Sequence, residues 1–183
     1  MSVRPVRVYG DPVLRERAAE VTAFDEELQR LVGDMRETMQ LYRGVGLAAN
    51  QIGVARRVAI VDVPLDDEQH AVYTLVNPEI ASRSGSDVGE EGCLSIPGMY
   101  EDVTRSLNVH VRALDERGQP YEFDAEGYLA RAIQHEIDHL DGVLFVDRLS
   151  PLKRQFLRRA LEALARGEMP EGYEPPSGTG ERI

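Results

Sequence analysis

His135-Glu136-Ile137-Asp138-His139 lies within a helical pattern of apolar residues that runs from Gly127 to Leu140. Residues four apart share one face of an α-helix, so both imidazoles can reach a single metal ion. Glu136 follows the first histidine directly and can exchange a proton with a water molecule at that metal. This is the H-E-x-x-H pattern of zinc hydrolases. The stretch therefore predicts a metal-binding helix.

Two histidines do not complete such a site, because a catalytic metal usually has three protein ligands and a water. Cys93, the only cysteine of the chain, is the candidate for the third ligand. It lies in Glu91-Gly92-Cys93-Leu94-Ser95, where Gly92 permits a tight backbone. A lone cysteine is more often a small buried apolar residue. The histidine pair favours metal ligation instead.

A third unusual segment is Gly44-Val45-Gly46-Leu47-Ala48-Ala49-Asn50-Gln51. Its glycines and alanines let a ligand approach the backbone closely. Gln51 offers a neutral amide donor that can stabilise an oxyanion. The same residues are equally consistent with a helix C-cap followed by a tight turn.

Composition limits the possible classes of protein. The formal net charge of −11 argues against a protein that coats nucleic acid, so no DNA partner is expected. No segment approaches the roughly 18 apolar residues of a membrane span. The single cysteine fits a reducing compartment, and residues 1–5 have no signal-peptide core. We therefore expect a cytoplasmic protein without membrane contact.

The expected elements mix helices with antiparallel strands without regular alternation, which indicates an α+β fold. Apolar spacing predicts helices over residues 25–43 and 127–140 and a last helix that starts at Ser150-Pro151. Strands are expected over residues 58–63, 71–76, 107–113 and 121–123, the second of them closed by Asn77-Pro78.

The last helix is expected to have an apolar stripe and a basic polar side. The stripe comprises Leu152, Phe156, Ala160, Leu161 and Leu164, and the basic residues are Lys153, Arg154, Arg158, Arg159 and Arg166. A run of charge is more often a solvated helix face than a binding surface.

Together the three segments resemble the peptide deformylase family, whose signatures are G-φ-G-φ-A-A-x-Q, E-G-C-φ-S and Q-H-E-x-D-H-φ-x-G. They occur here as residues 44–51, 91–95 and 134–142, in the family's order. The resemblance covers residues 4–166 and includes Leu144–Leu149, which is similar to the strand that follows the family's site. The short link after Cys93 resembles the first bacterial type of the family.

The resemblance implies a fold of antiparallel sheets packed around a central metal-binding helix, with a C-terminal helix. It implies one catalytic domain over residues 1–166, and the Pro- and Gly-containing residues 167–183 are expected to form a flexible tail. The implied reaction removes the formyl group from the N-terminal formyl-methionine of new proteins.

The resemblance also assigns roles to residues. Cys93, His135 and His139 would bind the metal, Glu136 would transfer protons, and the Gln51 amide and the Leu94 backbone N–H would stabilise the oxyanion. Val45 and Gly46 would pair with the peptide, and Gly44 and Gly92 would leave room for it. The charged residues Glu91, Arg105 and Asp138 would orient the ligands, with Arg105 pairing to one or both carboxylates.

The implied cofactor is Fe²⁺, for which Zn²⁺, Ni²⁺ or Co²⁺ can substitute. The implied partners are formyl-methionine nascent chains and, through the basic helix over residues 151–166, ribosomal RNA near the tunnel exit. Two alternatives remain open on the residues alone. One is a zinc endopeptidase with Glu162 or Glu168 as third ligand, and the other is a catalytically silent, ribosome-associated metal-binding module.

Overall fold

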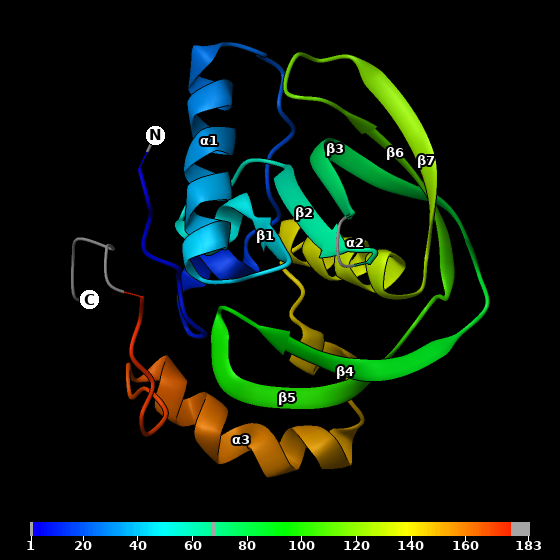
Figure 1. The fold of residues 1–183 in the computed structure, drawn as a ribbon. Helices are drawn as coiled ribbons and strands as arrows, with labels where there is room; N and C mark the ends of the chain where they lie inside the picture. Colours follow the sequence, from blue (N-terminus) through cyan, green and yellow to red (C-terminus); the bar gives the residue numbers. More distant parts are fainter. Residues whose placement is uncertain (1, 67–68, 177–183) are drawn as a thin grey trace.

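The computed structural model describes residues 2–66 and 69–176. A large sheet and a small hairpin lie on either side of one central helix, α2, and a last helix, α3, lies beneath the hairpin (Figure 1). This confirms the α+β fold predicted from the sequence and the antiparallel sheets around a central helix that the resemblance implied.

The large sheet contains five antiparallel strands in the order β1-β2-β3-β6-β7. Its central part is buried on both faces, because alternate residues of a strand point to opposite sides. In β2, Val58 and Ile60 pack with α1, whereas Ala59 and Val61 pack with α2. The strands are β1 (Gly46–Ala48), β2 (Val58–Pro64), β3 (His70–Ser84), β6 (Asn108–Leu114) and β7 (Pro120–Glu126).

The three predicted α-helices are confirmed. They are α1 (Glu26–Leu41), α2 (Gly127–Leu140) and α3 (Pro151–Ala165). The Asp25 carboxylate accepts a hydrogen bond from the Leu28 N–H at 3.1 Å and caps α1, an interaction that typically contributes about 1 kcal/mol. Ser150 caps α3 in the same way.

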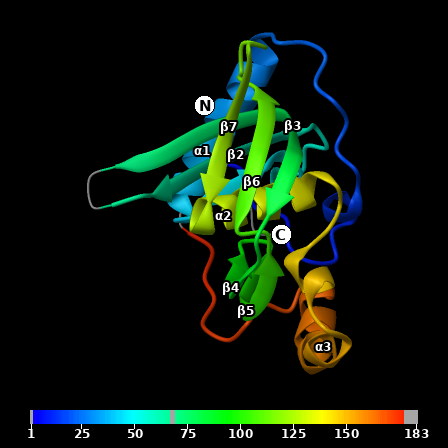
Figure 2. The same cartoon turned by 90° about the vertical axis from the view of Figure 1, so that its right-hand side faces the viewer.

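The second sheet is a hairpin of β4 (Asp87–Cys93) and β5 (Ile96–Arg105), which the sequence patterns did not predict. It packs through Ile96 and Val103 against a third apolar cluster that includes Phe145 and α3. In Figure 2 the hairpin lies below α2, on the side away from the large sheet. Cys93 is the last residue of β4, so the turn of the hairpin fixes its position.

Two predictions about strands are wrong. Asn77-Pro78 does not close the strand, because β3 continues to Ser84 through an irregularity between Val76 and Glu79. Asn77 has φ +48°, which asparagine tolerates, and a bulge accommodates the missing N–H of proline. Residues 144–149 form no strand but contain the 3-10 helix η3 (Phe145–Arg148), in which Asp147 accepts from the Leu144 N–H at 2.8 Å.

The expected apolar stripe of α3 is only half correct. Leu161 and Leu164 are buried in the third cluster, but Leu152 and Phe156 are 63% and 77% exposed. The apolar packing of α3 therefore runs from Leu157 to Leu164, and its first turn contacts the hairpin through the Lys153–Glu101 ion pair. None of the helices in the described ranges is both long and apolar enough to span a membrane.

Candidate metal centre and cleft

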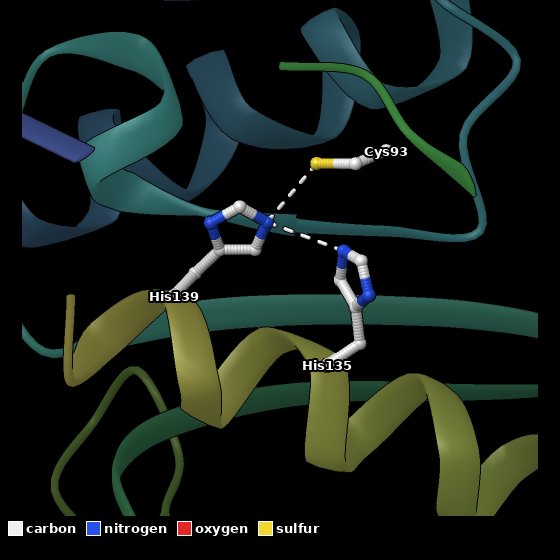
Figure 3. Close-up of side chains that lie close together, drawn as sticks. All are labelled: Cys93, His135 and His139. Carbon is white, nitrogen blue, oxygen red and sulfur yellow. Dashed lines mark hydrogen bonds between the residues drawn. The ribbon is translucent and has the colours of Figure 1, made fainter. Parts of the chain in front are cut away.

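The central helix brings both histidines of the H-E-x-x-H pattern to one place. Ile133 and Ile137 pack α2 against the large sheet, and His135 and His139 project from another face, 9% and 1% exposed. The Cys93 side chain reaches the same point from the end of β4 (Figure 3).

The three side chains converge closely enough to hold one ion. The Nε2 atom of His139 lies 3.2 Å from the Cys93 sulfur and 3.2 Å from His135 Nε2. A ring nitrogen carries at most one hydrogen, so ordinary hydrogen bonds cannot satisfy both contacts. Ligands held at about 2.0–2.3 Å in a tetrahedron lie roughly 3.3–3.6 Å from one another. The spacing and the S/N/N donor set therefore fit a divalent transition metal.

The surroundings shift the pKa values of the two histidines in opposite directions. Burial, together with the positive charge of nearby groups, lowers the pKa of His139 well below its usual value, so its lone pair is free. Burial alone would lower the pKa of His135, but contacts with Cys93 and Glu91 raise it. A carboxylate that accepts the other ring N–H of a histidine ligand raises the basicity of that histidine.

Glu136 is the acidic group beside these ligands. It is 4% exposed, and its Oε2 atom has no hydrogen-bond partner among the described residues. Burial raises the pKa of Glu136 to about 7. The backbone of β1 lies directly against it, because a Cβ on Gly46 would be 2.3 Å from Glu136 Oε1. A carboxylate with a pKa near neutrality and an unpartnered oxygen can both take and return a proton.

Gln51 is held rigidly on the other side of the sulfur, in the 3-10 helix η2 (Ala49–Ile52). Its Oε1 accepts from the Ala48 N–H at 2.9 Å, and its Nε2 donates to the Ser95 hydroxyl at 3.1 Å. The same nitrogen is 3.6 Å from the Cys93 sulfur. The amide therefore presents its donor end to the centre. Leu94 directly follows Cys93 and also lines the cleft.

Glu91, Arg105 and Asp138 form a buried ionic network behind the ligands. Arg105 donates twice to Glu91, at 2.8 and 2.9 Å, and also binds Asp138. Glu91 in turn contacts His135 Nδ1 at 3.0 Å. Burial would raise the pKa of Glu91, but the hydrogen bonds from Arg105 and His135 hold it far below its usual range. Arg105 was expected to pair with one or both carboxylates, and it pairs with both.

Two further arginines complete this network, and the sequence patterns did not assign them. Arg131, on α2, donates to Glu91 at 2.9 Å and to Asp87 at 2.9 Å. Arg148, on η3, binds both oxygens of Asp138. Arg131 lies one turn before His135 on the same helix, which was the only available signal.

A cleft with a volume of about 670 Å³ opens over the centre. Its lining includes Gly44, Val45, Gly46, Gly92 and Leu94. β1 is the outermost strand of its sheet, and no strand in the described ranges pairs with its free edge. An extended peptide could add there as a further strand.

The remaining candidates lie elsewhere. Glu162 and Glu168, the alternative third ligands, pair with Arg158 and Arg166 at α3. The structure brings Cys93, and neither of these glutamates, to the two histidines. The other two histidines of the chain, His70 and His110, pair with Asp62 and Asp124 on strands of the large sheet.

Comparison with known proteins agrees with this geometry. The model of the polypeptide deformylase family matches residues 3–155. A peptide deformylase from Alkalilimnicola ehrlichii is 52% identical over 166 residues, which are 91% of this chain and 93% of that protein. The crystal structure of a peptide deformylase from Legionella pneumophila superposes with a TM-score of 0.82 at 48% identity, covering 92% of this chain and all of that one. The crystal structure of peptide deformylase from Thermus thermophilus superposes with a TM-score of 0.83 at 44% identity. The match covers 91% of this chain and all of that one.

Proposed function

The chain belongs to the polypeptide deformylase family, and we propose how the residues of its cleft divide the work of the family's reaction. The enzyme removes the formyl group from the N-terminal formyl-methionine of newly synthesised proteins and releases formate. The observation that carries the proposal is the convergence of Cys93, His135 and His139 beside Glu136.

Cys93, His135 and His139 hold the metal. A divalent cation at this position supplies Lewis-acid chemistry and makes a water molecule acidic enough to lose a proton near pH 7. One thiolate and two imidazoles suit Fe²⁺, Zn²⁺, Co²⁺ and Ni²⁺ alike. We propose Fe²⁺ as the native metal, on the family resemblance, with the other three able to replace it.

Glu136 accepts a proton from the attacking water and returns it to the departing amine. Its unpartnered Oε2 atom and its burial support this role, because both keep the carboxylate available for a proton. Proton transfer by a positioned group is typically worth about 10²–10⁴-fold in rate.

Gln51 and the backbone N–H of Leu94 stabilise the oxyanion that forms on the formyl oxygen. The bonds of Gln51 to Ala48 and Ser95 fix its amide before the substrate arrives, so little reorganisation is needed during the reaction. Loss of one such donor typically costs about 10²–10³ in turnover.

The peptide pairs with the backbone at Val45 and Gly46, and Gly44 and Gly92 leave space for it. Support comes from the free edge of β1 and from the narrow space above Glu136. Since the formyl carbon carries only hydrogen, such a site admits a formyl group and excludes the larger acetyl group.

A formate-release assay on formyl-Met-Ala-Ser, run anaerobically beside the acetylated peptide, tests the proposal. We expect formate from the first peptide and no acetate from the second. Release from neither peptide by metal-loaded enzyme would refute the activity. Cys93→Ala should lose the metal, whereas an endopeptidase with a glutamate as third ligand would retain it.

We also propose that residues 1–166 form one catalytic domain that works in the bacterial cytoplasm and docks on ribosomal RNA through α3. Arg154 and Arg158 are exposed, and Leu152 and Phe156 lie exposed on the same helix. Charge reversal at Arg154 and Arg158 should abolish co-sedimentation with ribosomes and leave turnover of formyl-Met-Ala-Ser intact. Unchanged co-sedimentation would contradict docking through α3.

A further inference from the structure

The chain that follows α3 is turned back sharply by its own backbone. Gly167 has φ +82°, and its N–H donates to the Leu164 carbonyl at 2.8 Å. The next N–H, of Glu168, donates to the Ala163 carbonyl at 3.0 Å. These two bonds form a Schellman motif, which ends a helix and reverses the chain direction. The sequence predicted a flexible tail from residue 167, of which residues 177–183 lie outside the described part.

A second turn shapes the next residues. The Tyr173 N–H donates to the Pro170 carbonyl at 3.0 Å, and Gly172 between them has φ +76°, as the third position of a type II turn requires. Pro175 and Pro176 follow and restrict φ further. Residues 170–176 therefore have a defined backbone path, and we call them the C-terminal strap.

The strap lies against the catalytic cleft. Six of its seven residues, all except Pro175, line the same cavity as Gly46 and His135. Pro170 touches the hairpin, since a Cβ on Gly98 would be 3.1 Å from its Cγ. Tyr173 is half-buried, and burial together with the neighbouring Tyr42 raises its pKa. Figure 2 shows this segment, in red, leaving α3 and rising beside β4 and β5.

The strap lies at the mouth of the cleft and the metal ligands at its floor. His135 and His139 are buried, whereas Glu171 and Glu174 are exposed. A formyl group bound at the floor leaves the later residues of the peptide at the mouth, since an extended chain advances about 3.3 Å per residue. The family model ends at residue 155, so the strap lies outside the matched region.

The mouth carries more negative than positive charge. The acidic residues in the lining there are Glu90, Glu171 and Glu174, and the basic residue without a described acidic partner is Arg43. Arg131 also borders the cavity, but Asp87 and Glu91 neutralise it. A surface of this sign attracts cationic side chains and repels acidic ones.

We propose that the C-terminal strap forms the outer wall of the substrate cleft and makes the enzyme favour nascent chains with a basic side chain shortly after formyl-methionine. The inference rests on the deformylase activity described above and adds a selection among its substrates. Exposed charge pairs are weak, so each strap carboxylate should change the preference by about 1.5- to 5-fold.

Two tetrapeptides, formyl-Met-Ala-Lys-Ser and formyl-Met-Ala-Glu-Ser, test the proposal at low ionic strength. The ratio of their kcat/KM values should favour the lysine peptide in the parent enzyme. It should fall about 2- to 25-fold in a Glu171→Gln/Glu174→Gln variant, mainly through KM. A Glu162→Gln/Glu168→Gln variant removes the same charge from α3 and from the third residue beyond its end at Ala165, and should keep the parent ratio. Formyl-Met-Ala, which ends before the mouth, reports the basal reaction in each variant.

A ratio near one in the parent, or an equal ratio in the parent and the strap variant, would overturn the proposal. Deletion of residues 170–183 provides an independent measurement and should also remove the preference. If the deletion instead accelerates both tetrapeptides equally, the strap obstructs the cleft without selecting substrates, and the proposal fails. Absence of formate release from formyl-Met-Ala by the parent would count against the deformylase function itself.

Discussion

Glu136 and Gly46 touch across the cleft, and this contact sets how the acidic group can lie. Gly46 has no unusual φ, so its backbone does not require glycine. Space requires it, because a Cβ there would lie 2.3 Å from Glu136 Oε1. Glu136 is buried and cannot move into solvent to relieve the contact.

Gly46→Ala should therefore displace the Glu136 carboxylate while leaving the sheet intact. We expect kcat to fall by about 10²–10⁴, the range for loss of a positioned proton-transfer group. Steady-state formate release measures the loss, and circular dichroism checks the fold.

Gly92→Ala is the matched comparison. Its Cβ would be 2.4 Å from the Tyr100 ring, but Tyr100 is 63% exposed and can rotate away. Because Gly92 borders the space proposed for the peptide, Gly92→Ala should raise KM but change kcat much less than Gly46→Ala. Similar losses of kcat in both variants would show that the Glu136 contact has no special importance.

Residues with local chemical patterns could be predicted from the sequence, whereas their buried partners could not. The H-E-x-x-H spacing identified His135, Glu136 and His139 as candidates. Cys93 was a candidate because it is the only thiol of the chain. Arg131 has no such pattern, because its role depends on carboxylates that the fold brings from β4, 40 and 44 residues away.

At the scale of elements, Arg131 joins α2 to the hairpin. Besides Glu91 and Asp87 it binds the Val103 carbonyl at 2.7 Å, so one side chain contacts both β4 and β5. The helix and the hairpin each supply candidate metal ligands, so Arg131 fixes the position of His135 and His139 relative to Cys93.

Arg131→Met keeps the approximate length of the side chain but removes one of the two arginines that bind Glu91 and the donor to the Val103 carbonyl. We expect the free energy of unfolding to fall by about 1–3 kcal/mol. We also expect metal affinity to fall about 10–100-fold, because Glu91 orients His135. Urea unfolding and competition with a metal chelator measure the two effects.

Arg112→Met removes an exposed pair with Glu122 and should change stability by at most about 1 kcal/mol. Equal destabilisation in the two variants would contradict a special role for Arg131.

The helices could be predicted because their caps and apolar spacing are local. The hairpin could not, because β4 contains two glycines and three acidic residues without apolar alternation. Its pairing with β5 and its packing on Phe145 come from tertiary contacts. The composition of the strap suggested a loose tail, because its contacts with the cleft also depend on the tertiary fold.

At the scale of the whole molecule, Asp147 connects segments far apart in the chain. It pairs with Arg15 in the 3-10 helix η1 (Pro12–Arg15), more than 100 residues away. Burial would raise the pKa of Asp147, but the hydrogen bonds from Arg15 and the Leu144 N–H hold it below its usual value.

A depressed folded-state pKa means that this carboxylate stabilises the protein above its unfolded pKa of about 3.9 and loses that contribution as pH falls through the folded value. Asp147→Asn should lower the melting temperature at pH 7 by about 2–4 °C, since the pair is partly exposed and worth about 1 kcal/mol. The difference from the parent should shrink towards pH 3. A difference independent of pH would show that the charge of Asp147 is unimportant.

The metal should stabilise the whole fold, because its ligands come from α2 and from the separate hairpin. At a metal concentration 100 times Kd the gain is about 2.7 kcal/mol. A chelator should therefore lower the melting temperature, and added metal should restore it in a concentration-dependent way. Cys93→Ala should show little response, and a full response in that variant would argue against ligation by sulfur.

Cys93 is the only sulfhydryl of the chain, and it lies partly exposed at the metal centre. A bound metal would occupy a lone pair of the sulfur and lower its reactivity. Without metal, the sulfur can react with electrophiles. A colorimetric count of reactive thiols per molecule is consequently a direct gauge of how much of a preparation is metal-free. Oxidation of this thiol would remove a candidate metal ligand, so reductants and bound metal should both slow this form of inactivation.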